Sequence, residues 1–65
     1  MLNEDKIEEL KSQTNKMLLA LLGEELLVQQ WWHSQNWQFK LEKPYIVWEN
    51  DPQKVYDYVA NNFFR

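Results

Sequence analysis

Apolar positions recur every three or four residues through the first third of the chain, a spacing that places them on one face of an α-helix. The stripe consists of Ile7, Leu10, Thr14, Met17 and Leu21. Three more leucines widen it toward its end, which we expect to be buried on two sides: Leu18, Leu19 and Leu22. Asn3 can cap the first turn, and Gly23, the single glycine, stands where a helix would end in the left-handed conformation. The pattern predicts a helix over about residues 4–22.

Two further helices follow from the same kind of pattern. Glu24 and Glu25 favour the positive end of a second helix, which we expect to end near Ser34. Its apolar edge is made by Leu27, Val28, Trp31 and Trp32. Asp51 and Pro52 are typical of an N-cap followed by a proline at the first helical position. They predict a last helix over about residues 52–64, with an apolar stripe of Val55, Tyr58, Val59 and Phe63.

The segment 37–48 allows two interpretations. Trp37, Phe39 and Leu41 alternate with polar residues, and residues 45–48 are rich in strand formers, so a two-stranded hairpin is possible. The alternative is a loop followed by a short helix that has Pro44 at its first position. The local pattern favours the hairpin.

Composition limits what so short a chain can be. A domain of 65 residues buries only about 60% of its unfolded surface, and small domains usually add disulfides, a metal or a partner. The chain has no cysteine and one histidine, so neither a disulfide framework nor a zinc site is expected. We therefore expect one small domain over residues 1–65 that associates with a protein partner or with its own copies.

Charge and hydropathy exclude other classes. Ten acidic residues against seven basic ones give a net charge of −3, which argues against a nucleic-acid partner. No apolar run approaches the ~20 residues of a membrane span, and the start of the chain lacks the basic region of a signal peptide. We expect a cytoplasmic protein with no membrane partner.

Candidate catalytic groups are few. His33 precedes Ser34, but helix neighbours at one-residue spacing do not face each other. The carboxylate pairs are adjacent in sequence and do not converge, and one glycine cannot build a phosphate loop. We therefore expect no enzyme, no catalytic residue, no cofactor and no metal.

The aromatic residues are the remaining candidates. They make up 15% of the chain, and exposed aromatic clusters tend to mark contact surfaces. Trp31 and Trp32 point about 100° apart on a helix, so we expect one in the core and the other at its rim or in contact with a partner. The end of the chain can enter a partner's cleft, although a frayed helix tail is the simpler interpretation. The candidate partner-binding residues are Trp32, Trp37, Trp48, Tyr56, Phe64 and Arg65.

Several of these positions occur in a recognisable order: Gly23, Trp31, Asn36, Phe39, Pro44, Asp51-Pro52 and Val55. This order resembles the toxin-binding domain of the Xre/MbcA/ParS antitoxin family over residues 17–63. Three positions depart from the family pattern. Leu41 replaces a glycine, Trp32 replaces an aliphatic residue, and Gln35 replaces a proline.

The local pattern leaves an α+β fold with a hairpin at 37–48 as the alternative, whereas the resemblance implies an all-α bundle of about four helices. The resemblance also implies an antitoxin-like module that neutralises a RES-type, NAD-consuming toxin by occluding its active site, and that forms dimers. Trp31, Asn36 and Pro44 would be architectural, and Asn36 would tie a turn through side-chain hydrogen bonds. The helix-turn-helix domain of larger antitoxins has no counterpart before residue 17, so DNA binding is not expected.

Two other functions remain open. The chain could be a phage or mobile-element inhibitor of a host protein, whose complex with a basic factor would weaken in salt. It could also be a self-assembling structural module, because the stripe of the first helix fits a coiled-coil seam.

Overall fold

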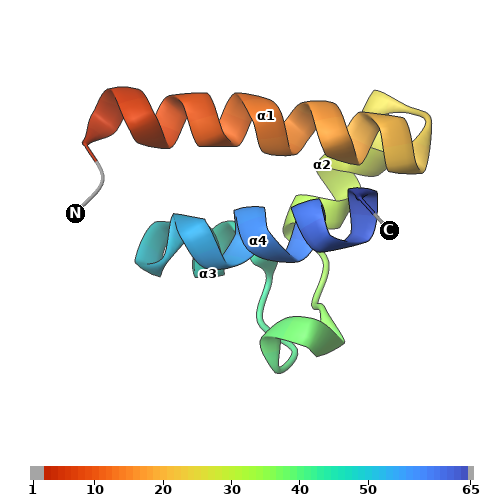
Figure 1. Ribbon diagram of the computed structural model, residues 1–65. Coiled ribbons are helices and arrows are strands. Elements are labelled where there is room, and N and C mark those ends of the chain that lie inside the picture. Colours follow the sequence, from red (N-terminus) through yellow and green to blue (C-terminus); the bar gives the residue numbers. More distant parts are fainter. Residues whose placement is uncertain (1–2, 65) are drawn as a thin grey trace.

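The computed structural model describes residues 3–64 and has an all-α architecture, which confirms the predicted fold class (Figure 1). Its elements are α1 (Glu4–Leu22), α2 (Glu25–His33), the 3₁₀ turn η1 (Trp37–Phe39), α3 (Pro44–Asn50) and α4 (Pro52–Phe63). Helices α1 and α4 lie side by side and run in the same direction, so that their C-terminal ends meet at one end of the molecule. Helix α2 begins at that same end.

The helix ends lie where the capping residues predict them. Asn3 Oδ1 accepts a hydrogen bond from the Lys6 backbone N–H at 2.8 Å, which caps α1. Gly23 ends that helix with a φ of 87°, in the left-handed region. Asp51 Oδ1 accepts from the Lys54 N–H at 3.3 Å at the start of α4. These local bonds satisfy terminal backbone groups that each helix leaves without an internal partner.

Gly23→Ala will lower the free energy of unfolding by about 1–2 kcal/mol, because an L-residue in the left-handed region is strained. No heavy atom lies within 4 Å of the position that a Cβ would occupy, so the loss will be a backbone effect and not a clash. Urea unfolding followed by circular dichroism measures it. Ala20→Gly, inside α1, serves as the reverse control and should cost about 1 kcal/mol for lost helix propensity. An unchanged stability for Gly23→Ala would contradict the strained cap.

The segment 37–48 forms η1 and α3, so the locally favoured hairpin is wrong and the helical alternative is confirmed. Pro44 stands at the first turn of α3, as that alternative required. Within residues 3–64, one isolated antiparallel bridge, between Asn36 and Glu42, is the only β pairing. The chain reverses before Pro44 because Lys40 and Leu41 take φ values of 55° and 67°. A local hydrophobic pattern does not reveal that reversal.

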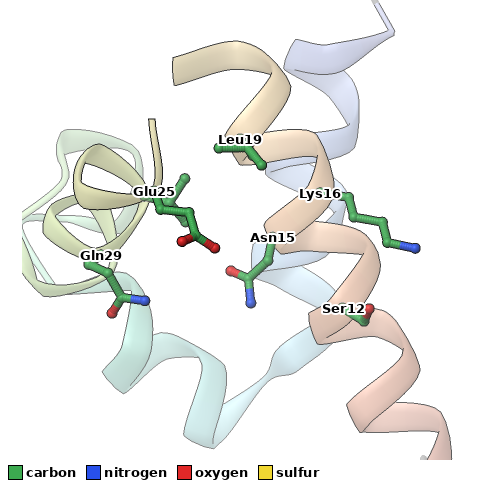
Figure 2. A pocket seen from close by; sticks show the side chains of 7 residues that line it. Ser12, Asn15, Lys16, Leu19, Glu25 and Gln29 are labelled. Atoms are coloured by element: carbon green, nitrogen blue, oxygen red, sulfur yellow. The ribbon is translucent and has the colours of Figure 1, made fainter. Parts of the chain in front are cut away.

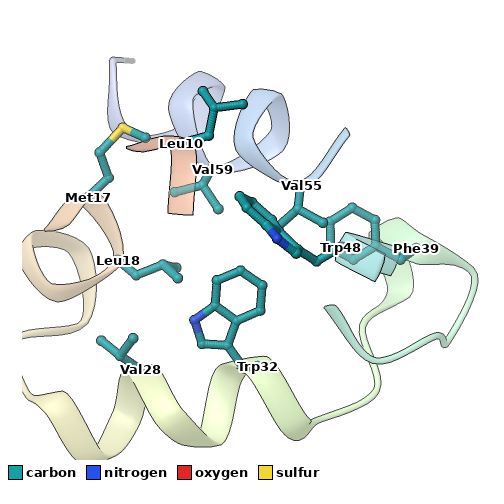
Figure 3. Close-up of a cluster of buried hydrophobic side chains, with 9 residues drawn as sticks. All are labelled: Leu10, Met17, Leu18, Val28, Trp32, Phe39, Trp48, Val55 and Val59. Carbon is teal, nitrogen blue, oxygen red and sulfur yellow. The ribbon is translucent and has the colours of Figure 1, made fainter. Parts of the chain in front are cut away.

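The core draws on all four helices and η1 (Figure 3). Its buried apolar side chains are Leu10, Met17, Leu18, Val28, Trp32, Phe39, Trp48, Val55 and Val59. Thr14 is also fully buried and donates its hydroxyl to the Leu10 carbonyl at 2.7 Å. The predicted two-sided burial of the end of α1 is wrong, because Leu19 and Leu21 are both exposed.

Candidate functional site

Two of the predicted contact residues, Trp32 and Trp48, belong to the core. They are 6% and 7% exposed and meet edge to face, with ring centroids 5.5 Å apart. The Trp32 indole N–H donates to Asn15 Oδ1 at 2.7 Å, so its polar atom is satisfied inside the molecule. The structure therefore corrects the sequence-based assignment: these two rings hold α2 and α3 together and offer a partner almost no surface.

The neighbouring Trp31 lies at the rim of the core. It is partly buried and its ring lies parallel to that of Tyr58, with centroids 6.5 Å apart and planes 9° apart. One member of the Trp31–Trp32 pair lies in the core and the other at its rim, as helix geometry predicts. The sequence assigned the two the wrong way round, because the direction in which α2 faces is set by packing against α1 and not by local sequence.

The other predicted contact residues differ in how exposed they are. Trp37 is 84% exposed and Phe64 is 75% exposed, so both are free to touch a partner. Tyr56 is partly buried against the core. Arg65 lies outside the described residues. In Figure 1 the turn η1, which begins with Trp37, lies apart from the C-terminal end of α4, which Phe64 caps.

A compact turn holds Trp37 in its exposed position. Asn36 Oδ1 accepts from the Gln38 backbone N–H at 2.9 Å, which confirms the predicted role of this asparagine. The Asn36 carbonyl accepts from the N–H groups of Phe39 and Leu41 at 3.0 and 2.9 Å. The turn is therefore fixed by its own hydrogen bonds, and Phe39 anchors it in the core.

An apolar groove opens between α1, α2 and α4, and the sequence did not predict it. Its volume is about 270 Å³ and it is lined by Leu18, Leu21, Leu22, Trp31, Tyr58, Val59 and Asn62. The single amide in this lining is partly engaged, since Asn62 Nδ2 donates to the Tyr58 carbonyl at 2.8 Å. Trp31 and Tyr58, whose rings are parallel, both line the groove.

The C-terminal ends of α1 and α4 and the N-terminal end of α2 meet at one end of the molecule (Figure 1), and each of these helix ends carries exposed apolar residues. We call this surface, together with the groove, the apolar end; its exposed members are Leu21, Leu26, Leu27, Phe63 and Phe64. Leu26 is 66% exposed, which is costly for a leucine unless something covers it. The sequence feature that could have predicted this surface is the number of leucines near the end of α1 and the start of α2, which exceeds what one helical stripe needs.

Two hollows elsewhere are lined largely by polar side chains. One of about 410 Å³ lies between α1 and α2 (Figure 2), and one of about 290 Å³ lies beside it and includes His33. Ser12 lines the first hollow and His33 the second. Ser34 Oγ donates to the Gln30 carbonyl at 2.7 Å, within its own helix. The aromatic ring beside the His33 imidazole is that of Tyr45, with ring centroids 4.8 Å apart.

Residues 3–64 contain neither a cluster of metal ligands nor a membrane-spanning helix. No group of three or more His, Asp or Glu side chains in residues 3–64 is arranged to hold a metal ion. Over the same range, none of the helices combines the length and apolar character needed to cross a membrane.

Comparison with known proteins found no relative. No model of a protein family, no curated protein and no solved structure matches this chain. The antitoxin resemblance therefore rests on the ordered residues quoted for it and stays a prediction.

Proposed function

We propose that this chain is a protein-binding module that docks through its apolar end. The observation that carries the proposal is an apolar groove at one end of the molecule, where the helix ends that meet there also carry five exposed Leu and Phe residues. Contiguous apolar surface of this kind on a small protein is typical of an interaction site. The two polar hollows are lined by side chains that do not form a comparable apolar surface.

Within this proposal, the partner is a RES-type, NAD-consuming toxin, and the chain acts as its antitoxin by covering the active site. The conformation of the turn at residues 36–44 supports the family resemblance. Leu41, which replaces the family's glycine, has a φ of 67°, a conformation that glycine adopts without strain. Asn36 ties the turn and Pro44 starts the next helix, as that resemblance requires.

Leu41→Gly will be more stable than Leu41→Ala by about 1 kcal/mol, because only alanine keeps the strain of the left-handed conformation. Both variants lose the same leucine side chain, so their difference isolates the backbone. Thermal or urea unfolding measures it. At Asn61, exposed inside α4, the order should reverse, with alanine about 1 kcal/mol better than glycine. The same order at both positions would contradict the observed turn.

Co-expression with a RES-domain toxin tests the proposed partner. We expect the two chains to co-purify and the NAD-consuming activity of the toxin to fall as the antitoxin is added in stoichiometric amounts. Absence of a complex at micromolar concentration, with both proteins folded, would reject the antitoxin role. A catalytically inactive toxin variant keeps the host cell alive and serves as a bait for binding alone.

The self-assembly alternative requires the apolar stripe of α1 to pair with a second copy of the chain. Leu10, Thr14 and Met17 are buried in the core of a single chain, so they cannot also pair with another copy of α1 without unfolding the bundle. Dimerisation and a cytoplasmic location remain predictions, and sedimentation equilibrium of the purified chain tests the first. The host-inhibitor alternative uses the same apolar end, and it differs in the partner that a pull-down would recover.

A further inference from the structure

Acidic residues outnumber basic ones in the segments that form the apolar end. Residues 17–39 contain no lysine or arginine, and their only acidic residues are Glu24 and Glu25, at the start of α2; Glu25 also lines the polar hollow between α1 and α2, together with Lys16. On the neighbouring helix, residues 55–64 carry a single charged side chain, that of Asp57. Arg65 follows in sequence, outside the described residues. Even when Arg65 and Lys16 are both counted, three acids stand against two bases.

Two helix dipoles add to this negative potential. Helix α1 has 19 residues and α4 has 12, and both end at the apolar end without a basic residue in the last turn. The C-terminus of a helix carries a partial charge of about −0.5. The N-terminus of α2 has the opposite sign, but the two glutamates there more than offset it. The apolar end is therefore both hydrophobic and electronegative.

From this combination we propose that the occupant of the apolar end is a cationic amphipathic helix of the partner protein, an inference that rests on the proposed function. Apolar side chains on one face of that helix enter the groove against Trp31 and Tyr58. Lysine or arginine side chains at its edges face the acids, and an arginine can also stack on an exposed ring. Helix-in-groove docking of this kind needs apolar anchors at three- and four-residue spacing.

A second copy of the chain fits the surface less well. A symmetric contact through two apolar ends would bring both sets of glutamates and helix C-termini together, and like charges repel. The first turns of α1 are no better as an occupant, because residues 4–10 carry four acids and one lysine. The same charge argument disfavours an anionic lipid surface.

Two synthetic peptides of 18 residues test the inference on the full chain. Both place leucines at helical three- and four-residue spacing; one has lysine at every polar position and the other has glutamate. Binding is followed by the NMR signals of the Trp31 indole N–H and the Asn62 side-chain amide. We expect the lysine peptide to bind at least tenfold more tightly and to shift both signals. Equal affinities, or shifts confined to other residues, would overturn the inference.

A matched pair of variants separates local from overall charge. Glu24→Gln with Glu25→Gln removes two acids from the first turn of α2 and its cap, whereas Glu4→Gln with Asp5→Asn removes two from the first turn of α1. Both pairs change the net charge by the same amount. We expect the first pair to weaken binding of the lysine peptide about fivefold and the second to leave it unchanged. If both pairs weaken binding equally, the peptide responds to the net charge of the chain and not to the acids at the apolar end, and the inference is overturned.

The peptide results and the toxin results can fail separately. If the toxin complex forms and its contacts map to the apolar end, but the lysine peptide has no preference there, only the cationic helix is rejected. If the toxin complex fails while the lysine peptide binds as described, the antitoxin role is rejected and the cationic partner stands. If dilution of the free chain shifts the groove signals, a second copy is the occupant and the inference is overturned.

Discussion

Replacing Trp32 with alanine will remove a large part of the free energy of unfolding of the chain. The ring is 6% exposed and contacts Trp31 and Trp48 edge to face, with centroids 5.2 and 5.5 Å away. Removing a buried tryptophan costs about 3–5 kcal/mol. A domain of this length has a total stability of only about 3–10 kcal/mol, at about 0.05–0.15 kcal/mol per residue. Urea unfolding followed by far-ultraviolet circular dichroism measures the loss.

Two variants control this result. Trp37→Ala removes the same side chain from a site that is 84% exposed, and it should change stability by less than about 0.5 kcal/mol. Trp32→Phe keeps an aromatic ring but loses the hydrogen bond to Asn15, so its cost should lie between the two. A Trp32→Ala protein that stays as stable as the parent and loses only its partner would return this residue to the binding surface, where the sequence had placed it.

The ends of the helices could be predicted because their determinants are local. Asn3 and Asp51 each bond the N–H group three residues ahead, and Gly23 adopts the conformation in which glycine is least strained. These contacts span four residues at most, so sequence alone contains them. The same holds for Asn36, whose predicted bond reaches only to Gln38.

The exposure of side chains could not be predicted because it depends on where distant elements pack. Trp31 and Trp32 have the same local surroundings, yet only Trp32 reaches across to Asn15 and Trp48. The alternation of Trp37, Phe39 and Leu41 suggested a strand, but it reflects a tight turn that buries Phe39 alone. The apolar groove has no local signature, since its lining comes from three helices.

Leu21→Gln will weaken binding of the partner about 30-fold, whether that partner is the toxin or the lysine peptide. Leu21 lines the groove and is still 46% exposed, so its free surface is available to be covered in a complex. Burying an amide there without a hydrogen-bond partner costs about 1–3 kcal/mol, and a loss near 2 kcal/mol corresponds to about 30-fold in affinity. Isothermal titration calorimetry measures the change, and unfolding curves should move by less than about 1 kcal/mol.

Leu41→Gln is the matched control, because Leu41 is also 46% exposed but lies in the turn that carries Trp37. The two variants remove the same side chain and add the same amide, one in the last turn of α1 and the other between η1 and α3. If the partner docks on the apolar end, only Leu21→Gln weakens binding. If Leu41→Gln weakens it and Leu21→Gln does not, the binding surface is the turn around Trp37, where the sequence had placed one of its contacts. Because leucine and glutamine have similar size and helix propensity, neither result can be attributed to a change in the fold of α1.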